Sequence, residues 1–326
     1  MGDWSLIGVR FALYLTLAAL FGLAAFSLYG LRTGERGDAL ALRPWLVASA
    51  VLGLLFSTAW VVLMASSMAG TPAWPIDREA VDGLLTGSTV GAAWKLRIVM
   101  LVLAALAALV AAGRGIWLSA VALCSAVALA TLAWTGHGPM DEAAKGWVHL
   151  IADIFHLIAS GAWVGALLGL ILLVTRPASR VDAAHLGLTH RALHGFGTVG
   201  TVVVSTIVVT GLVNGWMLVG IGNIVTLPTT LYGQLLIAKL ALFVAMLGLA
   251  SLNRFRLSPA FERSIAVDDH GAALRALRAS LGIETACVVA VLRLVAWLGT
   301  LAPPRIGDVM HSRGAPAFPG PPGARA

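Results

Sequence analysis

Long apolar runs separated by short polar segments dominate the chain. Each run is close to or above the roughly 20 residues that an α-helix needs to cross a hydrocarbon core about 30 Å thick. A transmembrane β-barrel would show alternating segments of about ten residues, whereas these runs are continuous and rich in Ala and Leu. We therefore predict an all-α, polytopic membrane helix bundle. Its eight transmembrane helices are expected at residues 6–31, 45–69, 92–112, 116–135, 147–175, 196–219, 232–252 and 281–302.

The domain organisation follows from the same pattern. We expect a single eight-helix membrane domain over residues 1–302, with spans one to four in residues 1–135 and spans five to eight in residues 136–302. The first run is too long for a signal-peptide core and lacks a basic leader, so it is predicted to be a retained span. Residues 303–326 are rich in Pro, Gly and Ala, which predicts a disordered periplasmic tail.

Composition agrees with a membrane protein and excludes a cytosolic enzyme. Hydrophobic residues make up 59% of the 326 positions and charged residues 11%, whereas a soluble domain carries about 25% charged residues. The net charge of +7 raises the question of a nucleic-acid partner. The basic residues lie in short loops between apolar runs and not on one face. We therefore predict that the protein contacts membrane lipid and binds no nucleic acid.

Loop charges predict the orientation, because Lys and Arg accumulate on the cytoplasmic side of short loops. The loops after the odd-numbered spans hold twelve basic residues, whereas the other side holds five, three of them in the tail. Both termini are therefore expected in the periplasm. The twelve residues are Arg32, Arg36, Arg43, Arg114, Arg176, Arg180, Arg191, Arg254, Arg256, Arg263, Arg275 and Arg278.

The fifth span carries the clearest polar pattern. His149, Asp153, His156 and Trp163 follow one another at offsets of 4, 7 and 14 residues from the first, which places them within roughly 80° of one helix face. Ionisable side chains inside a span are costly and usually face a bundle interior, so this stripe is expected to point inward. For either histidine alone, a structural role and a functional role remain equally open.

Soft ligands near the predicted periplasmic side suggest a metal. His137 and Met140 lie in the connection before the fifth span, and Met64 and Met68 lie one turn apart near the outer end of the second span. Thioether and imidazole groups together favour Cu(I). Methionines at helical spacing are more often core filler, yet their occurrence on the same side as the histidines favours a copper site made of His149, His156, Asp153, His137, Met140, Met64 and Met68.

Excess positive charge inside the spans favours a second hypothesis. Arg10, Arg97 and Lys239 lie in the outer third of their spans, where Asp153 is the single carboxylate. Buried cations need anionic partners such as this carboxylate, lipid phosphate or haem propionates. A b-type haem protein that transfers electrons would use the histidines as axial ligands. Since His149 and His156 share one helix, that reading requires another ligand such as His137. Asn214 is expected to form a structural hydrogen bond between helices.

Several short motifs together resemble the copper-resistance D (CopD) family of bacterial inner-membrane proteins. The likeness is strongest over residues 196–304 and covers most of the chain apart from the tail. Earlier matches are MAG at 68–70, Trp94 with Arg97, and His156 followed by GAWVG at 161–165. The denser later matches are TGLVN at 210–214, YGQLLIAK at 232–239, NRFRLSP at 253–259 and LGTLAPP at 298–304.

The resemblance implies a multi-pass inner-membrane protein for copper resistance or copper uptake, often beside a periplasmic copper-binding partner of the CopC type. Arg293 departs from the apolar run that the family's last span implies. The leading interpretation is a copper permease or accessory protein that is not an enzyme. The alternatives are the haem protein and a metal-free assembly factor that binds its partner through the apolar connection at residues 221–231.

Overall fold

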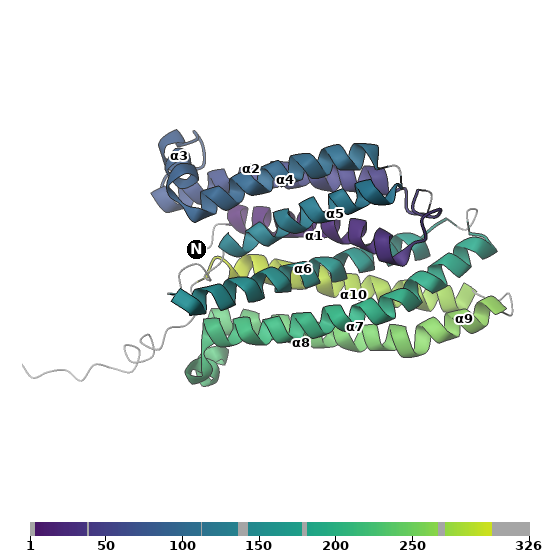
Figure 1. Ribbon diagram of the computed structural model, residues 1–326. Helices are drawn as coiled ribbons and strands as arrows, with labels where there is room; N and C mark the ends of the chain where they lie inside the picture. Colours follow the sequence, from purple (N-terminus) through teal and green to yellow (C-terminus); the bar gives the residue numbers. More distant parts are fainter. Residues whose placement is uncertain are drawn as a thin grey trace, which may run out of the picture.

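The computed structural model describes residues 4–37, 39–111, 113–135, 143–177, 181–266 and 271–301. Within these ranges, eight helices are long and apolar enough to cross a membrane, which confirms the predicted all-α bundle. Figure 1 shows them side by side along one common direction. They are α1 (Trp4–Gly30), α2 (Leu42–Ala69), α4 (Thr89–Val110), α5 (Gly115–Ala130, continued by η1 to Thr135), α6 (Ala143–Val174), α7 (Ala183–Val219), α8 (Leu231–Leu252) and α10 (Gly271–Leu298). The predicted tail at residues 303–326 lies outside the described residues.

The remaining elements are short. Among them, α3 occupies a connection in which the hydropathy pattern predicts no helix. The side chain of Asp77 accepts a hydrogen bond of 3.0 Å from the backbone N–H of Ala80 and so caps its first turn. Leu84 of the same helix is buried. The short elements are α3 (Arg78–Gly87), η1 (Thr131–Thr135), η4 (Ile221–Thr229), η5 (Asn253–Leu257) and α9 (Ser258–Ala266).

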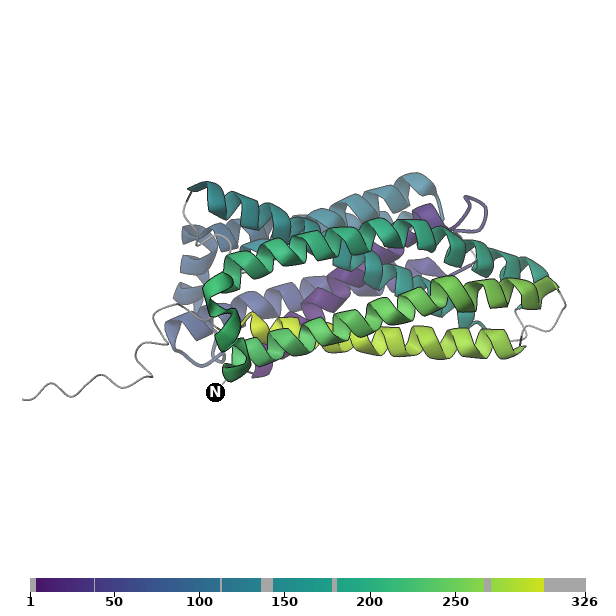
Figure 2. The same cartoon turned by 90° about the horizontal axis from the view of Figure 1, so that it is seen from below.

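Three spanning helices extend beyond their predicted apolar runs at the end opposite the N-terminus. α7 begins at Ala183 and α10 at Gly271, whereas α8 continues through η5 into α9 and ends at Ala266. With 37 residues, α7 measures about 55 Å at a rise of 1.5 Å per residue, well beyond a hydrocarbon core. The added turns carry basic residues that the sequence pattern assigns to loops. Hydropathy alone therefore predicts these three helices too short. Figure 2 shows the extensions projecting past the other helices.

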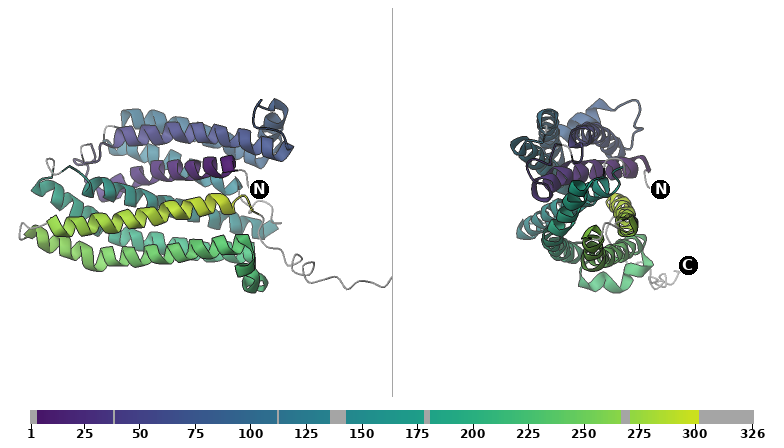
Figure 3. Two further views of the ribbon diagram at one scale, coloured as in Figure 1. Left: turned by 180° about the vertical axis from the view of Figure 1, so that it is seen from behind. Right: turned by 90° about the vertical axis from the view of Figure 1, so that its right-hand side faces the viewer.

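α1 lies in the middle of the bundle and joins its two halves. It packs against α2 and α5 on one side and against α6, α7 and α10 on the other. The end-on view in Figure 3 shows the same arrangement, with α2, α4 and α5 on one side of α1 and α6, α7, α8 and α10 on the other. Consequently, α2 and α6 make no contact with one another.

Glycines allow α1 and α6 to approach closely. A methyl group on Gly22 of α1 would lie 2.5 Å from the Cα atom of Gly165 of α6, and a methyl group on Gly165 would overlap the backbone of Gly22. Small residues at helix interfaces let backbones meet in membranes, where packing replaces the hydrophobic effect as the driving force. This contact therefore fixes the position of α6, the helix that carries the polar stripe.

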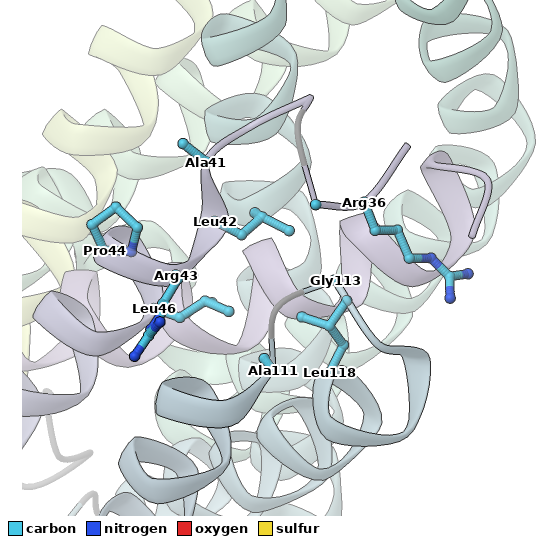
Figure 4. Close-up of a pocket in the computed structure, with 10 residues that line it drawn as sticks. Arg36, Ala41, Leu42, Arg43, Pro44, Leu46, Ala111, Gly113 and Leu118 are labelled. Atoms are coloured by element: carbon cyan, nitrogen blue, oxygen red, sulfur yellow. The ribbon is translucent and has the colours of Figure 1, made fainter. Parts of the chain in front are cut away.

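A pocket of about 290 Å³ lies where the α1–α2 connection meets the α4–α5 connection. In Figure 4, Arg36 and Arg43 lie on opposite sides of it. The guanidinium of Arg36 donates to the carbonyl oxygens of Ser27 and Leu28, at 3.0 and 2.8 Å. These bonds satisfy carbonyl groups in the last turn of α1. The Arg36 guanidinium therefore caps the end of α1, and we assign no binding role to this pocket.

Candidate functional site

The polar stripe of α6 faces other helices. His149 and Trp163 are buried, with 1% and 2% of their surfaces exposed, and Asp153 and His156 are half-buried. By contrast, Ile151 and Phe155 on another face of the same helix are more than half exposed. α6 packs against α1, α7 and α10, so its polar face lies inside the bundle.

α7 supplies hydrogen-bond partners to this stripe. The amide group of Asn214 donates to the carboxylate of Asp153 at 2.6 Å, and Nδ1 of His156 lies 3.0 Å from the hydroxyl oxygen of Thr210. Thr210 and Asn214 are one helical turn apart and therefore share a face of α7. Gly211 lies between them, and a Cβ atom there would be 3.6 Å from Cε1 of His156. The TGLVN motif thus provides two polar partners and the space for an imidazole ring.

α8 adds the positive charge. Lys239 is half-buried and interacts electrostatically with both Asp153 and His156. The ring of His149 also acts on Asp153, so this carboxylate interacts with groups of α6 and α8. A charge in a low-dielectric interior needs such a partner. We call this group the α6–α8 polar cluster, and its members are His149, Asp153, His156, Thr210, Asn214 and Lys239.

One polar atom of the cluster has no protein partner. The amide oxygen of Asn214 is buried and accepts no hydrogen bond within the part of the chain that the structure describes. Leaving a buried acceptor unsatisfied costs about 1–3 kcal/mol. Its position next to Asp153 makes it available to a ligand or to a water molecule.

Other predicted metal ligands do not join the cluster. Met64 and Met68 belong to α2, which does not contact α6 because α1 lies between them. Met64 packs against the core, whereas Met68 is 68% exposed near the end of α2. His137 and Met140 lie outside the described residues. Across the described ranges, no three His, Cys, Asp or Glu side chains are grouped so that they hold one metal ion.

Arg10 and Arg97 are both buried, and they lie outside the α6–α8 polar cluster. Arg97 is fully buried on α4, where its guanidinium donates to the hydroxyl and carbonyl oxygens of Thr131 at 2.8 and 3.2 Å and lies 5.6 Å from the ring centroid of Trp60. Its charge interacts with Tyr14 and with Arg10. Since the charge interactions of Lys239 are with Asp153 and His156, the three cations do not act as one group.

Trp163 belongs to a second polar group, which the sequence pattern does not predict. Its indole N–H donates to Glu284 at 3.1 Å, and the amide of Asn253 donates to the other oxygen of the same carboxylate at 2.9 Å. These three residues come from α6, α10 and η5 and are more than 30 positions apart in sequence. A glutamate within an apolar run is the one sequence signal for this group. Arg293, which has no predicted partner, lies 5.4 Å from the ring centroid of Phe11.

The fold and the cluster define a polytopic membrane protein with polar and charged side chains enclosed between its helices. Comparison with known families assigns the class more closely. The family described as copper resistance protein D-like, N-terminal domain, matches residues 1–150, and copper resistance protein D matches residues 190–298. The chain is 44% identical over 308 residues to the copper resistance protein D of Pseudomonas syringae pv. tomato, covering 93% of this chain and 98% of that one. The chain therefore belongs to the copper resistance protein D family and is a multi-pass protein of the bacterial inner membrane.

Two further relatives share about half of the chain. The copper transport protein CutJ of Bacillus subtilis (strain 168) is 29% identical over 169 residues, which are 50% of this chain and 30% of that protein. The inner membrane protein YebZ of Escherichia coli (strain K12) is 28% identical over 172 residues, 53% of this chain and 55% of that one. No solved structure matches the chain.

Proposed function

We propose that the protein moves copper across the inner membrane and that the α6–α8 polar cluster is the site through which copper passes. One observation carries the proposal: His149, Asp153 and His156 share one face of α6, where His149 is buried and the other two are hydrogen-bonded by α7 and interact electrostatically with Lys239 of α8. Family membership and the names of two relatives, a copper resistance protein and a copper transport protein, support copper as the cargo.

The chemistry of the cluster suits a transient copper site. Imidazole nitrogen is a good copper ligand, and His149 and His156 lie about 10 Å apart along the axis of α6 at 1.5 Å per residue. An ion would therefore pass from one ring to the other instead of being chelated by both. Asp153 lies between them in sequence and supplies negative charge. Because Lys239 competes for that charge, the site would bind copper weakly enough to release it.

Copper would enter from the end that holds the N-terminus, which the loop charges predict to be periplasmic. The thioether of the exposed Met68, with His137 and Met140, would capture Cu(I) there, because soft ligands favour that oxidation state. A periplasmic CopC-type protein is the proposed copper donor. Moving an ion requires no covalent chemistry, so we propose a transporter and not an enzyme.

The haem alternative is less well supported. An axially ligated haem between helices needs histidines on facing helices. In the described ranges, the histidines outside α6 are His185, His190 and His194, which lie in the first turns of α7 at the opposite end of the bundle. These rings are too far along the bundle to pair with His149 across one haem, and His137, the ligand that this hypothesis names, lies outside the described residues.

Copper retention by purified protein tests the proposed site. We expect the double variant His149→Ala, His156→Ala to retain less copper per chain than the wild type after size-exclusion chromatography, measured by elemental analysis. The matched control is Ile151→Ala, Phe155→Ala, which alters two side chains of α6 that are 51% and 56% exposed. The control should retain wild-type copper, and equal copper in the histidine double variant would remove the assignment.

A further inference from the structure

A large cavity lies at the end of the bundle opposite the N-terminus. It has a volume of about 580 Å³ and is lined by α6, α7, α10 and the segment from the end of α8 through η5 to α9. Of these, α7, α10 and the α8–α9 segment extend past the rest of the bundle in Figure 2. Loop charges predict this end to be cytoplasmic. None of the α6–α8 polar cluster residues lines the cavity, so it is a separate site.

The cavity wall contains a buried carboxylate without a charged partner. Glu284 is 1% exposed, and its two oxygens accept hydrogen bonds from the neutral groups of Trp163 and Asn253. No cationic side chain of the described residues acts on it. A buried charge that is left uncompensated costs several kcal/mol. A cation bound in the cavity would therefore stabilise the ionised form of Glu284.

A second polar atom at the same wall also lacks a partner. Asn253 is 8% exposed, it lines the cavity, and its amide oxygen accepts no hydrogen bond within the described ranges. Arg254, the basic residue of the wall, does not donate to this oxygen. Its guanidinium donates to the carbonyl oxygen of Gly197 and to the hydroxyl of Thr201. The wall thus presents an unsatisfied acceptor beside an uncompensated carboxylate.

Metal-ligating side chains line the same cavity. His190 and His194 lie one turn apart on α7, and their ring centroids are 6.3 Å apart. Histidines at this spacing share one helix face and bind a common metal ion in known helical sites. Nε2 of His190 lies 3.5 Å from a carboxylate oxygen of Glu262 on α9. Because the Glu262 side chain is 66% exposed, it is free to turn toward an ion, although the three groups do not surround one point in this structure.

We propose that this cavity is a second copper site, at which His190 and His194 bind the ion and Glu284 supplies the compensating charge. The identity of the cation rests on the proposed function. Trp163 follows His156 by seven residues on α6, which is about 10 Å along the helix. The two sites therefore lie at successive levels of one helix, and the cavity would receive copper after it leaves the α6–α8 polar cluster.

Counting bound ions separates the two sites. The full chain in lipid nanodiscs is titrated with Cu(I) against a competing chromophoric chelator. We expect about two ions per wild-type chain and about one in His190→Ala, His194→Ala. Glu284→Gln should weaken one of the two sites on the order of tenfold, as expected for the loss of one nearby charge. The matched control Ser205→Ala, Ser251→Ala changes two other residues of the cavity wall and should bind two ions.

The outcomes for the two proposals are distinguishable. If His190→Ala, His194→Ala binds as many ions as the wild type, or if Glu284→Gln leaves both affinities unchanged, the cavity is not a copper site. If His149→Ala, His156→Ala binds as many ions as the wild type while the cavity variant loses one, the cavity site stands and the proposed role of the polar cluster fails. Thermal melting of each variant checks that a lost ion does not reflect a lost fold.

Discussion

Gly165→Ala is expected to destabilise the folded bundle by about 3 kcal/mol or more. The added methyl group would overlap the backbone of Gly22, and a backbone cannot rotate away as a flexible side chain does. Overpacking a well-packed interior costs typically about 1–3 kcal/mol, and a clash between backbones lies at or above the upper end of that range. α1 and α6 would have to separate, which also displaces the polar stripe of α6.

The measurement is the melting temperature of the detergent-solubilised protein, followed by fluorescence-detected size-exclusion chromatography after heating. We expect a decrease of at least about 5 °C for Gly165→Ala. Gly248→Ala in α8 is the matched control, because a Cβ atom there meets nothing within 4 Å. Equal melting temperatures for the two variants would show that α1 and α6 do not meet as described.

Asp153→Asn is expected to impair both copper binding and stability. The substitution removes the negative charge that acts on Lys239 and His149 and leaves a half-buried cation without a partner. Removing one member of a buried ion pair costs about 3–5 kcal/mol. Asp153 and Lys239 are half-buried and interact electrostatically, so we expect a smaller cost of about 2 kcal/mol. Copper affinity should fall more than tenfold, because the ion then meets only positive charge.

A double variant separates the two effects. Adding Lys239→Met to Asp153→Asn removes the uncompensated cation, so the melting temperature should return toward that of the wild type. Copper affinity, measured by the same chelator competition, should stay low because the carboxylate is still missing. Recovery of both quantities in the double variant would mean that Asp153 serves only to neutralise Lys239.

Hydropathy predicts the spanning helices well for two reasons. A helix must be long enough to cross the hydrocarbon core, and backbone N–H and C=O groups in lipid must be hydrogen-bonded within the helix. The same criterion fails at the far ends of α7, α8 and α10, where helices continue into water. There, capping groups such as Asp182, whose side chain accepts from the backbone of His185, determine where a helix starts. α3 is missed for the same reason, since Asp77 begins it outside any apolar run.

The site is predictable in part. A helical period places His149, Asp153 and His156 on one face, and the cost of polar groups in lipid predicts that this face is enclosed. The partners on α7 and α8 depend on how far each helix slides along α6, which no local pattern determines. The orientation rule places Met64 on the expected side of the membrane. It contains no information on lateral position, and α1 separates this methionine from α6.

Copper flux into proteoliposomes tests the central claim most directly. Purified protein is reconstituted into vesicles that contain a Cu(I)-responsive dye, and Cu(I) is added outside as a soluble complex. We expect the wild type to fill vesicles faster than protein-free controls and His149→Ala, His156→Ala to fill them at the protein-free rate. Flux by the double variant at the wild-type rate would contradict passage through the α6–α8 polar cluster. A wild type no faster than empty vesicles would contradict transport itself.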